Sequence, residues 1–272
     1  MKKTLHGIFT LMIALTTSQA ANYLTVDFST GYTGGNLVGQ NGWLQTSTTT
    51  TNPIQYNSSA GAVIIGNTGQ DVYKAFTTQA PKTDGSSLLT RLDFKFTAVQ
   101  ATGDYFFNLS DPAGTTQNFY GRLFARSSGS GFNLGLLTTS GTGSATQWTT
   151  SIFNLNQSYT AVLAWNFVGG AANDTMALYI NPSTDNISGL TAEVSSNWLS
   201  TSVGEPTTNL SAVNLRQGSS TTAPTLNATY ISVGNTLGDV GIVIVPEPSS
   251  GALLVLGGAA LVAVRSFRKK NS

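Results

Sequence analysis

Hydrophobic and polar residues alternate along several stretches of the chain, most regularly in residues 91–97. There Leu92, Phe94 and Phe96 occupy every second position, and the residues between them are charged or polar. A period of two residues is typical of a β-strand that presents one face to a core and the other to water. The sequence therefore predicts a half-buried strand at this position.

Similar alternation recurs further along the chain. The apolar sets are Tyr105, Phe107 and Leu109; Phe119 and Leu123; Phe132, Leu134 and Leu136; Tyr159, Ala161, Leu163, Trp165 and Phe167; Met176, Leu178 and Ile180; residues 226–233; and residues 240–245. Turn-forming Gly, Pro, Asn and Asp residues separate them, and we expect residues 169–174 to form a hairpin loop. Because no long amphipathic helical pattern accompanies these strands, the sequence predicts an all-β, antiparallel sandwich.

The N-terminus has the features of an export signal. Lys2 and Lys3 precede a mostly apolar stretch at residues 5–15, and small residues occur just before Ala21. We expect a signal peptide at residues 1–20, cleaved between Ala20 and Ala21. The apolar stretch is too short for a first transmembrane helix, and no stop-transfer pattern follows it.

The C-terminal segment, residues 246–272, combines three features in a fixed order. Pro246, Glu247 and Pro248 end the preceding fold, because proline cannot donate a backbone hydrogen bond. Residues 251–264 carry no charged or strongly polar side chain, and this stretch favours one transmembrane helix over a buried terminal helix. The basic residues that follow would stop translocation and keep the C-terminus in the cytoplasm: Arg265, Arg268, Lys269 and Lys270.

This order of Pro-Glu-Pro, hydrophobic helix and basic tail resembles the PEP-CTERM sorting segment of exported bacterial proteins. The resemblance implies that an exosortase-type membrane enzyme recognises and processes the tail, often in bacteria that secrete exopolysaccharide. A plain permanent anchor is the alternative, because such a helix would serve either purpose. In both cases the bulk of the chain is expected outside the cytoplasm, anchored at its C-terminus. Processing of a sorting segment would then release it to the cell surface or matrix.

Residues 21–245 form the predicted ectodomain, and their pattern resembles a known fold family. A long aromatic strand at residues 159–167 is followed by a Gly-rich turn with Asn173 and Asp174, and then by Ala-Leu-Tyr-Ile-Asn-Pro at residues 177–182. This order resembles the concanavalin A-like jelly roll of legume-type lectins, laminin-G-like domains and some glucanases. The resemblance implies a jelly-roll-type sandwich in which the strand near residues 26–28 lies close to the one near residues 231–233.

The ectodomain is acidic, although the whole chain has a net charge of +1. Residues 21–245 contain seven basic and eleven acidic residues, a net charge of 7 − 11 = −4. The basic residues are scattered along the sequence, so a nucleic-acid partner is not expected. Cysteine is absent, and the single histidine, His6, lies in the predicted signal peptide. The mature protein therefore cannot contain a His-dependent metal site, a Ser-His-Asp triad or a Cys-His pair.

Candidate groups for carbohydrate chemistry are few. A glycosidase needs two carboxyl groups about 5 to 9.5 Å apart, and the ectodomain has only two glutamates, Glu193 and Glu205, neither in an alternating strand. Glycan binding through aromatic faces is the other option. The candidate platforms at or near predicted loops are Trp43, Trp148 and Trp198, whereas Trp165 lies on the most apolar strand and is expected in the core.

Calcium ligands are not assigned by any motif. The Asp residues in predicted turns are Asp104, Asp111, Asp174, Asp185 and Asp239. Such residues are common in turns because they hydrogen-bond to their own backbone, and no calcium-binding loop motif is present. No cofactor is therefore expected. The sequence favours a non-catalytic, exported cell-surface or matrix protein; an exopolysaccharide-binding, lectin-like module is the alternative, and a glycoside hydrolase is less favoured.

Overall fold

The computed structural model describes residues 21–46, 48–80, 82–111, 118–138, 146–170, 173–183, 187–197 and 209–242. The predicted signal peptide and the predicted sorting segment lie outside these residues, as do Trp198, Glu205 and Asp185. The domain boundaries, the cleavage after Ala20 and the anchoring tail therefore stay predictions. Within the part of the chain that the structure describes, no helix is long and apolar enough to span a bilayer.

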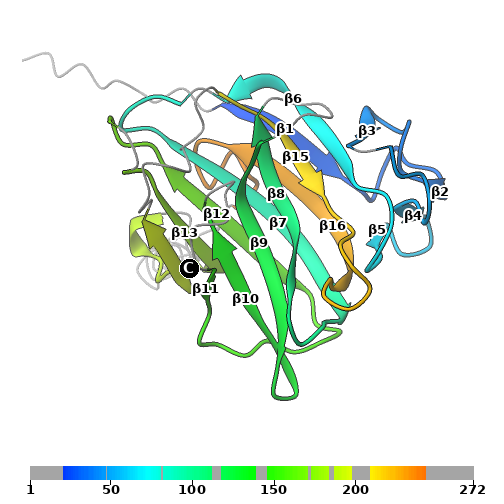
Figure 1. The fold of residues 1–272 in the computed structure, drawn as a ribbon. Coiled ribbons are helices and arrows are strands. Elements are labelled where there is room, and N and C mark those ends of the chain that lie inside the picture. Colours follow the sequence, from blue (N-terminus) through cyan, green and yellow to red (C-terminus); the bar gives the residue numbers. More distant parts are fainter. Residues whose placement is uncertain are drawn as a thin grey trace, which may run out of the picture.

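Two antiparallel sheets face each other and form a sandwich (Figure 1). In the described residues, the nine-stranded sheet consists of β1 (Asn22–Asp27), β2 (Gly35–Asn36), β4 (Gln55–Asn57), β5 (Ala62–Ile65), β7 (Ser87–Ala98), β12 (Tyr159–Asn166), β13 (Thr175–Ile180), β14 (Val194–Asn197) and β16 (Thr225–Gly234). The seven-stranded sheet consists of β3 (Trp43–Gln45), β6 (Val72–Ala80), β8 (Asp104–Asp111), β9 (Asn118–Ser128), β10 (Gly131–Leu137), β11 (Gln147–Trp148) and β15 (Leu210–Leu215). A short 3-10 helix, η1 (Ile187–Gly189), precedes β14. The predicted antiparallel β-sandwich is confirmed, and the arrangement is consistent with a jelly roll.

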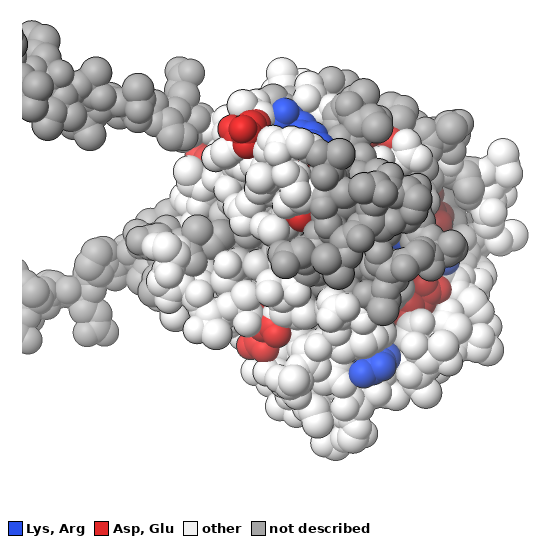
Figure 2. Space-filling model, turned by 60° about the vertical axis from the view of Figure 1, so that its left-hand side comes forward, with Lys and Arg blue, Asp and Glu red and all other residues white. Residues whose placement is uncertain are grey.

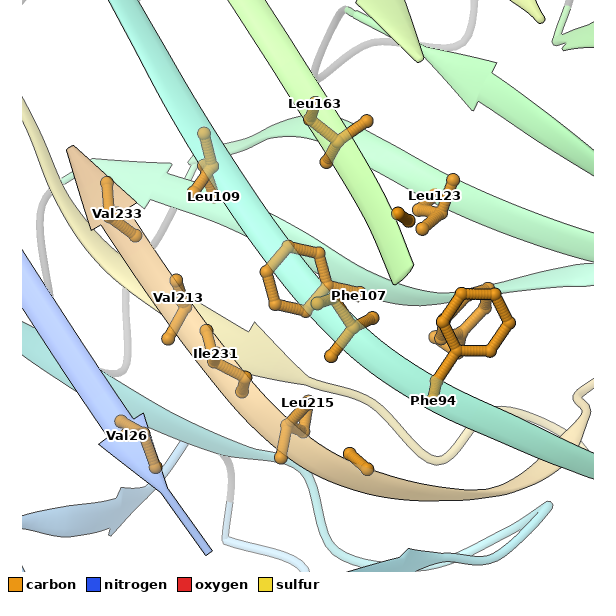
Figure 3. Close-up of a cluster of buried hydrophobic side chains, with 14 of the residues drawn as sticks. Val26, Phe94, Phe107, Leu109, Leu123, Leu163, Val213, Leu215, Ile231 and Val233 are labelled. Carbon is orange, nitrogen blue, oxygen red and sulfur yellow. The ribbon is translucent and has the colours of Figure 1, made fainter. Parts of the chain in front are cut away.

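Alternating apolar side chains from both sheets meet between them and form one continuous core. Figure 3 shows part of this core, with Phe94 and Ile231 from the nine-stranded sheet and Phe107 and Val213 from the seven-stranded sheet. Burying such side chains provides about 25 cal/mol per Å² of apolar surface. The stability of a chain without cysteine therefore rests on this packing.

The predicted proximity of the first and last strands is also confirmed. β1 pairs with β16 in antiparallel register, and Val26 lies opposite Ile231. β16 pairs with β7 along its other edge and with β5 at its N-terminal end. This late strand therefore joins the first strands of the chain to the middle of the nine-stranded sheet.

The predicted strand at residues 240–245 is wrong where the structure describes it. Residues 237–241 form turns; Val240 N–H donates to the Thr236 carbonyl (3.3 Å) and Ile242 N–H to the Leu237 carbonyl (2.9 Å). Leu237, Val240 and Ile242 pack on Leu89 and neighbouring side chains of the nine-stranded sheet, away from the main core. The apolar residues thus cover the sheet as a turn and do not extend it.

The hairpin predicted around residues 169–174 joins β12 to β13, which pair in register. Asp174 anchors this hairpin from a fully buried position: its carboxylate accepts hydrogen bonds from the Trp165 indole N–H (3.2 Å) and the Val168 backbone N–H (2.8 Å), and the Lys82 ammonium lies 3.6 Å away. The carboxylate thus serves the fold, which agrees with a structural reason for Asp in turns.

Charged side chains are sparse on the surface. Figure 2 shows one face on which Lys, Arg, Asp and Glu occupy separate spots in a mostly uncharged surface. On β7, Arg91 forms an ion pair with Asp93 (2.6 Å), and its guanidinium lies 4.6 Å from the centre of the Tyr230 ring. These residues therefore form a small local cluster and no continuous basic stripe.

Candidate functional site

The three tryptophans proposed as glycan platforms have different outcomes. Trp43 on β3 is completely buried, and its ring packs beside Phe28 with the ring centres 6.0 Å apart. Its indole N–H donates to the Tyr32 hydroxyl (3.2 Å). The prediction for Trp43 is wrong because this ring completes the core near the sheet edge. Trp198 lies outside the described residues, and Trp148 is half-buried on β11.

Trp148 belongs to a surface that we call the outer face, the side of the seven-stranded sheet that points away from the core. On β9, Leu123 and Ala125 point into the core, so Arg122, Phe124 and Arg126 point to the outer face. This face is turned toward the viewer in Figure 1, across β8, β9, β10 and β15. β9 therefore presents two arginines and one aromatic ring outside the core.

A bulge in β8 adds Tyr105 to the outer face. The sequence predicts Tyr105 on the same side as Phe107 and Leu109, and this is wrong for Tyr105. The β8–β9 register shifts between Tyr105 and Phe107, so that Phe107 lies opposite core residue Leu123 while Tyr105 lies opposite Phe124. The extra residue of a bulge reverses the side on which the preceding residues lie.

A second bulge, in β9, turns Phe119 away from the core. The alternation predicts Phe119 and Leu123 on one face, but Leu123 is in the core while Phe119 lies 6.4 Å from Tyr105, measured between ring centres. Gly121 has φ +56°, a left-handed conformation that favours glycine. An isolated glycine within a strand pattern is the sequence signal that could have indicated this bulge.

Aromatic rings and guanidinium groups alternate across the outer face. We call this set the arginine–aromatic row: Tyr105, Phe124 and Trp148 with Arg122, Arg126 and Arg216. The guanidinium carbon lies 4.0 Å from the Tyr105 ring centre for Arg216, 5.4 Å from the same centre for Arg122, and 4.1 Å from the Trp148 ring centre for Arg126. Phe124 lies between the other two rings, 5.5 Å from Tyr105 and 6.2 Å from Trp148. Stacked guanidinium groups therefore cover aromatic surface on this face.

A missing side chain at Gly135 lets Trp148 lie close to the sheet. Gly135 on β10 is opposite Trp148, and a Cβ atom there would lie 2.8 Å from the indole. With Arg126 over its ring, Trp148 is supported by the sheet and contacted by a cation. The half-buried indole is therefore less an open platform for a sugar than a support that positions a guanidinium.

Neighbouring charges set the proton affinity of the row. Burial alone would lower the pKa of the Arg216 guanidinium, but the hydrogen bond and charge of Asp104 raise it above its ordinary value. The two groups form an ion pair of 2.8 Å. Burial lowers the pKa of Arg122, and the charge of Arg216 contributes in the same direction. Burial also raises the pKa of the Tyr105 hydroxyl. Both guanidinium groups stay cationic at pH 7, because arginine is not deprotonated in proteins, and the Tyr105 hydroxyl stays neutral.

Two amide side chains lie on the outer face beside the row. Asn214 on β15 is opposite Asn108 on β8, and both are at least 97% buried. Asn108 donates to the Leu109 carbonyl (2.9 Å), but neither the Nδ2 nor the Oδ1 atom of Asn214 has a hydrogen-bond partner. The neighbouring Ser110 hydroxyl lacks a partner as well. A buried polar group without a partner costs about 1–3 kcal/mol. These atoms lie inside the protein, so they lower its stability and are not open to a ligand.

One carboxyl group near the row has an unusual pKa. Burial raises the pKa of Asp71 to about 6, although the Gln217 backbone N–H, which donates to Asp71 Oδ1 (2.7 Å), and the Arg216 charge oppose this shift. Such a group can act as an acid or base. Its neighbour Asp104, however, is held by Arg216 and by the Thr222 hydroxyl (3.1 Å). Asp71 is therefore the carboxyl group with a raised pKa at this end of the row, beside an ion-paired Asp104.

Two further candidate residues in the described part of the chain have local partners. Glu193 accepts a hydrogen bond from the Ser151 hydroxyl (2.7 Å), and Asp239 accepts two from backbone N–H groups of its own turn. Within the described residues, no group of three or more acidic side chains could hold a metal ion. These side chains thus stabilise turns and loops.

No protein-family model matches the sequence, and no curated protein matches it. Similar solved structures include the globular domain of T. cruzi calreticulin, 9% identical with a TM-score of 0.49, covering 81% of this chain and 90% of that one. A putative beta-glucanase from Mycobacterium abscessus is 10% identical with a TM-score of 0.47, covering 78% and 100%. Lectin II from Ulex europaeus is 9% identical with a TM-score of 0.45, covering 79% and 100%. At these identities and TM-scores, the likeness assigns no activity to this chain.

Proposed function

We propose that the chain is an exported, non-catalytic protein whose sandwich binds a polysaccharide on the outer face of the seven-stranded sheet. The observation that carries this proposal is the arginine–aromatic row on the outer face. Carbohydrate sites combine apolar ring surface with a few polar groups that fix orientation. This face carries the half-buried rings of Phe124 and Trp148 beside arginine side chains, and a linear polymer could extend across several of its strands.

The absence of catalysis is part of the proposal. Among the described residues, Asp71 has a raised pKa, but the neighbouring Asp104 is bound to Arg216 and Thr222. The mature chain has no histidine or cysteine to replace a second carboxyl group. A face that binds without a complete acid–base pair suits a surface or matrix component better than a hydrolase.

Binding and hydrolysis are tested with the full chain purified in detergent micelles. We expect retention in affinity gels that contain a bacterial exopolysaccharide, without release of reducing ends. Trp148→Ala should weaken retention several-fold, because it removes ring surface and the ring that lies under Arg126. Thr97→Ala, which changes an exposed residue on the other sheet, should leave retention unchanged. Hydrolysis that is lost in Asp71→Asn, Glu193→Gln or Glu205→Gln would instead show a glycosidase.

We propose further that the tail directs sorting by an exosortase-type enzyme, supported by the order of Pro246-Glu247-Pro248, apolar segment and basic cluster. The test compares wild type with a triple Pro246→Ala, Glu247→Ala, Pro248→Ala variant in the native host. Wild type should lose its C-terminal mass and leave the membrane, whereas the variant should stay intact and bound. Intact C-termini and equal membrane fractions for both proteins would identify a permanent anchor.

A further inference from the structure

The outer face carries a group of arginine side chains. Three of the seven basic residues in residues 21–245 belong to the arginine–aromatic row, although this segment has a net charge of 7 − 11 = −4. Elsewhere, Lys82 lies 3.6 Å from Asp174 and Arg91 pairs with Asp93. This face therefore differs in charge from the ectodomain as a whole.

Arg126 is the member of the row that is most available to an anion. Among the residues that the structure describes, no carboxylate lies within 4.0 Å of its guanidinium nitrogens, and the side chain is partly exposed. Arg216, by comparison, already pairs with Asp104 at 2.8 Å. A ligand with negative charge would thus gain most at the Arg126 end of the row.

Stacking prepares these guanidinium groups for planar anions. A guanidinium that lies over an aromatic ring keeps its N–H donors in its own plane, where they can bind both oxygens of one carboxylate. Arg126 lies over Trp148 and Arg216 over Tyr105, so both are held by their rings before a ligand arrives. Less side-chain entropy is then lost on binding than for a free arginine.

We propose that the ligand of the outer face is an acidic polysaccharide whose sugars carry carboxylate groups. Carboxylates bind the arginine–aromatic row, chiefly at Arg126. This inference rests on the proposed polysaccharide binding and names the chemical class of its ligand. Guanidinium groups cover ring surface at Tyr105 and Trp148, so charge contributes more to recognition here than open aromatic faces do.

The test uses the full chain in detergent with polygalacturonate and with the same polymer in its methyl-esterified form, which lacks the charge. We expect polygalacturonate to bind at least ~10-fold more tightly, a difference of about 1.4 kcal/mol. Raising salt from about 0.01 M to about 0.15 M shortens the screening length from about 30 Å to about 8 Å. This change should weaken binding of the acidic polymer and leave the ester unaffected.

Matched variants locate the contact. Arg126→Gln should weaken polygalacturonate binding by ~10-fold, or about 1.4 kcal/mol, and Arg126→Lys should weaken it less because the charge remains. Lys95→Gln removes one positive charge from the far side of the other sheet and is the control. Equal affinities for acid and ester, or equal losses for Arg126→Gln and Lys95→Gln, would overturn the inference while leaving polysaccharide binding intact. Failure to bind either form or any neutral glycan would refute both proposals.

Discussion

The raised pKa of Asp71 leads to a prediction in which a buried carboxyl group destabilises the protein near neutral pH. Asp71 precedes β6, and its Oδ1 atom accepts the Gln217 backbone N–H. The Asp71→Asn variant has nearly the same shape and keeps an oxygen that can accept this hydrogen bond. It removes only the group that must ionise in a partly buried position.

The size of the effect follows from the shift. The pKa rises from 3.8 to about 6, and each unit corresponds to about 1.4 kcal/mol. Between these values the folded protein binds more protons than the unfolded chain, so the free energy of unfolding falls as pH rises. The cost is absent below about pH 4 and reaches about 3 kcal/mol above about pH 6. Asp71→Asn should therefore be more stable than wild type at pH 7 by up to this amount.

Urea unfolding of both proteins between about pH 4 and pH 7.5 measures the difference. With a denaturant slope of about 3 kcal/mol per M, the variant midpoint should lie about 1 M higher at pH 7 and merge with that of wild type near pH 4. The comparison within each pH cancels the other titrating groups. A variant that is less stable at pH 7, or a difference that does not change with pH, would refute the reasoning.

Three further substitutions test the packing. Asp174→Ala should cost about 3 kcal/mol or more in thermal denaturation, because the buried Trp165 indole N–H loses its acceptor; a loss under about 1 kcal/mol would contradict this role. Gly121→Ala should cost about 1–2 kcal/mol, since φ is +56° and the new Cβ would lie 2.9 Å from Met176; a neutral effect would argue against the bulge. Burial lowers the pKa of Lys74 from 10.5. Lys74→Met should therefore raise the free energy of unfolding at pH 7, and this gain should shrink as pH rises toward 10.5. A gain that stays constant with pH would contradict this explanation.

The sandwich could be predicted because most strands keep strict alternation. β12 is an example: Tyr159, Ala161, Leu163, Trp165 and Phe167 were assigned to one face by spacing alone, and all lie in the core. The short strands β2 to β5 have two to four residues each and no such signal. This explains the error at Trp43, which follows a glycine in a polar stretch and nevertheless fills the core.

The candidate site was less accessible to sequence reasoning. Arg122, Phe124 and Arg126 alternate with core residues, so their shared face could have been read from β9. The position of Tyr105 on this face could not be predicted, because the bulge that turns it outward has no glycine beside it to signal the irregularity. Arg216 reaches Tyr105 only through the pairing of β15 with β8. Such contacts join strands that are far apart in sequence, so they can be predicted only when the order of strands in the sheet is known.

The position of β16 in the nine-stranded sheet has a consequence for the order of events during synthesis. β16 is the last strand in the described chain, yet it pairs with β1, β5 and β7. A polypeptide emerges from a ribosome or a membrane pore with its N-terminal end first. Until residues 225–234 emerge, the strands they join have no partner at these edges, and the sheet cannot close. The nine-stranded sheet therefore reaches its full set of strands only after almost all of the domain has emerged.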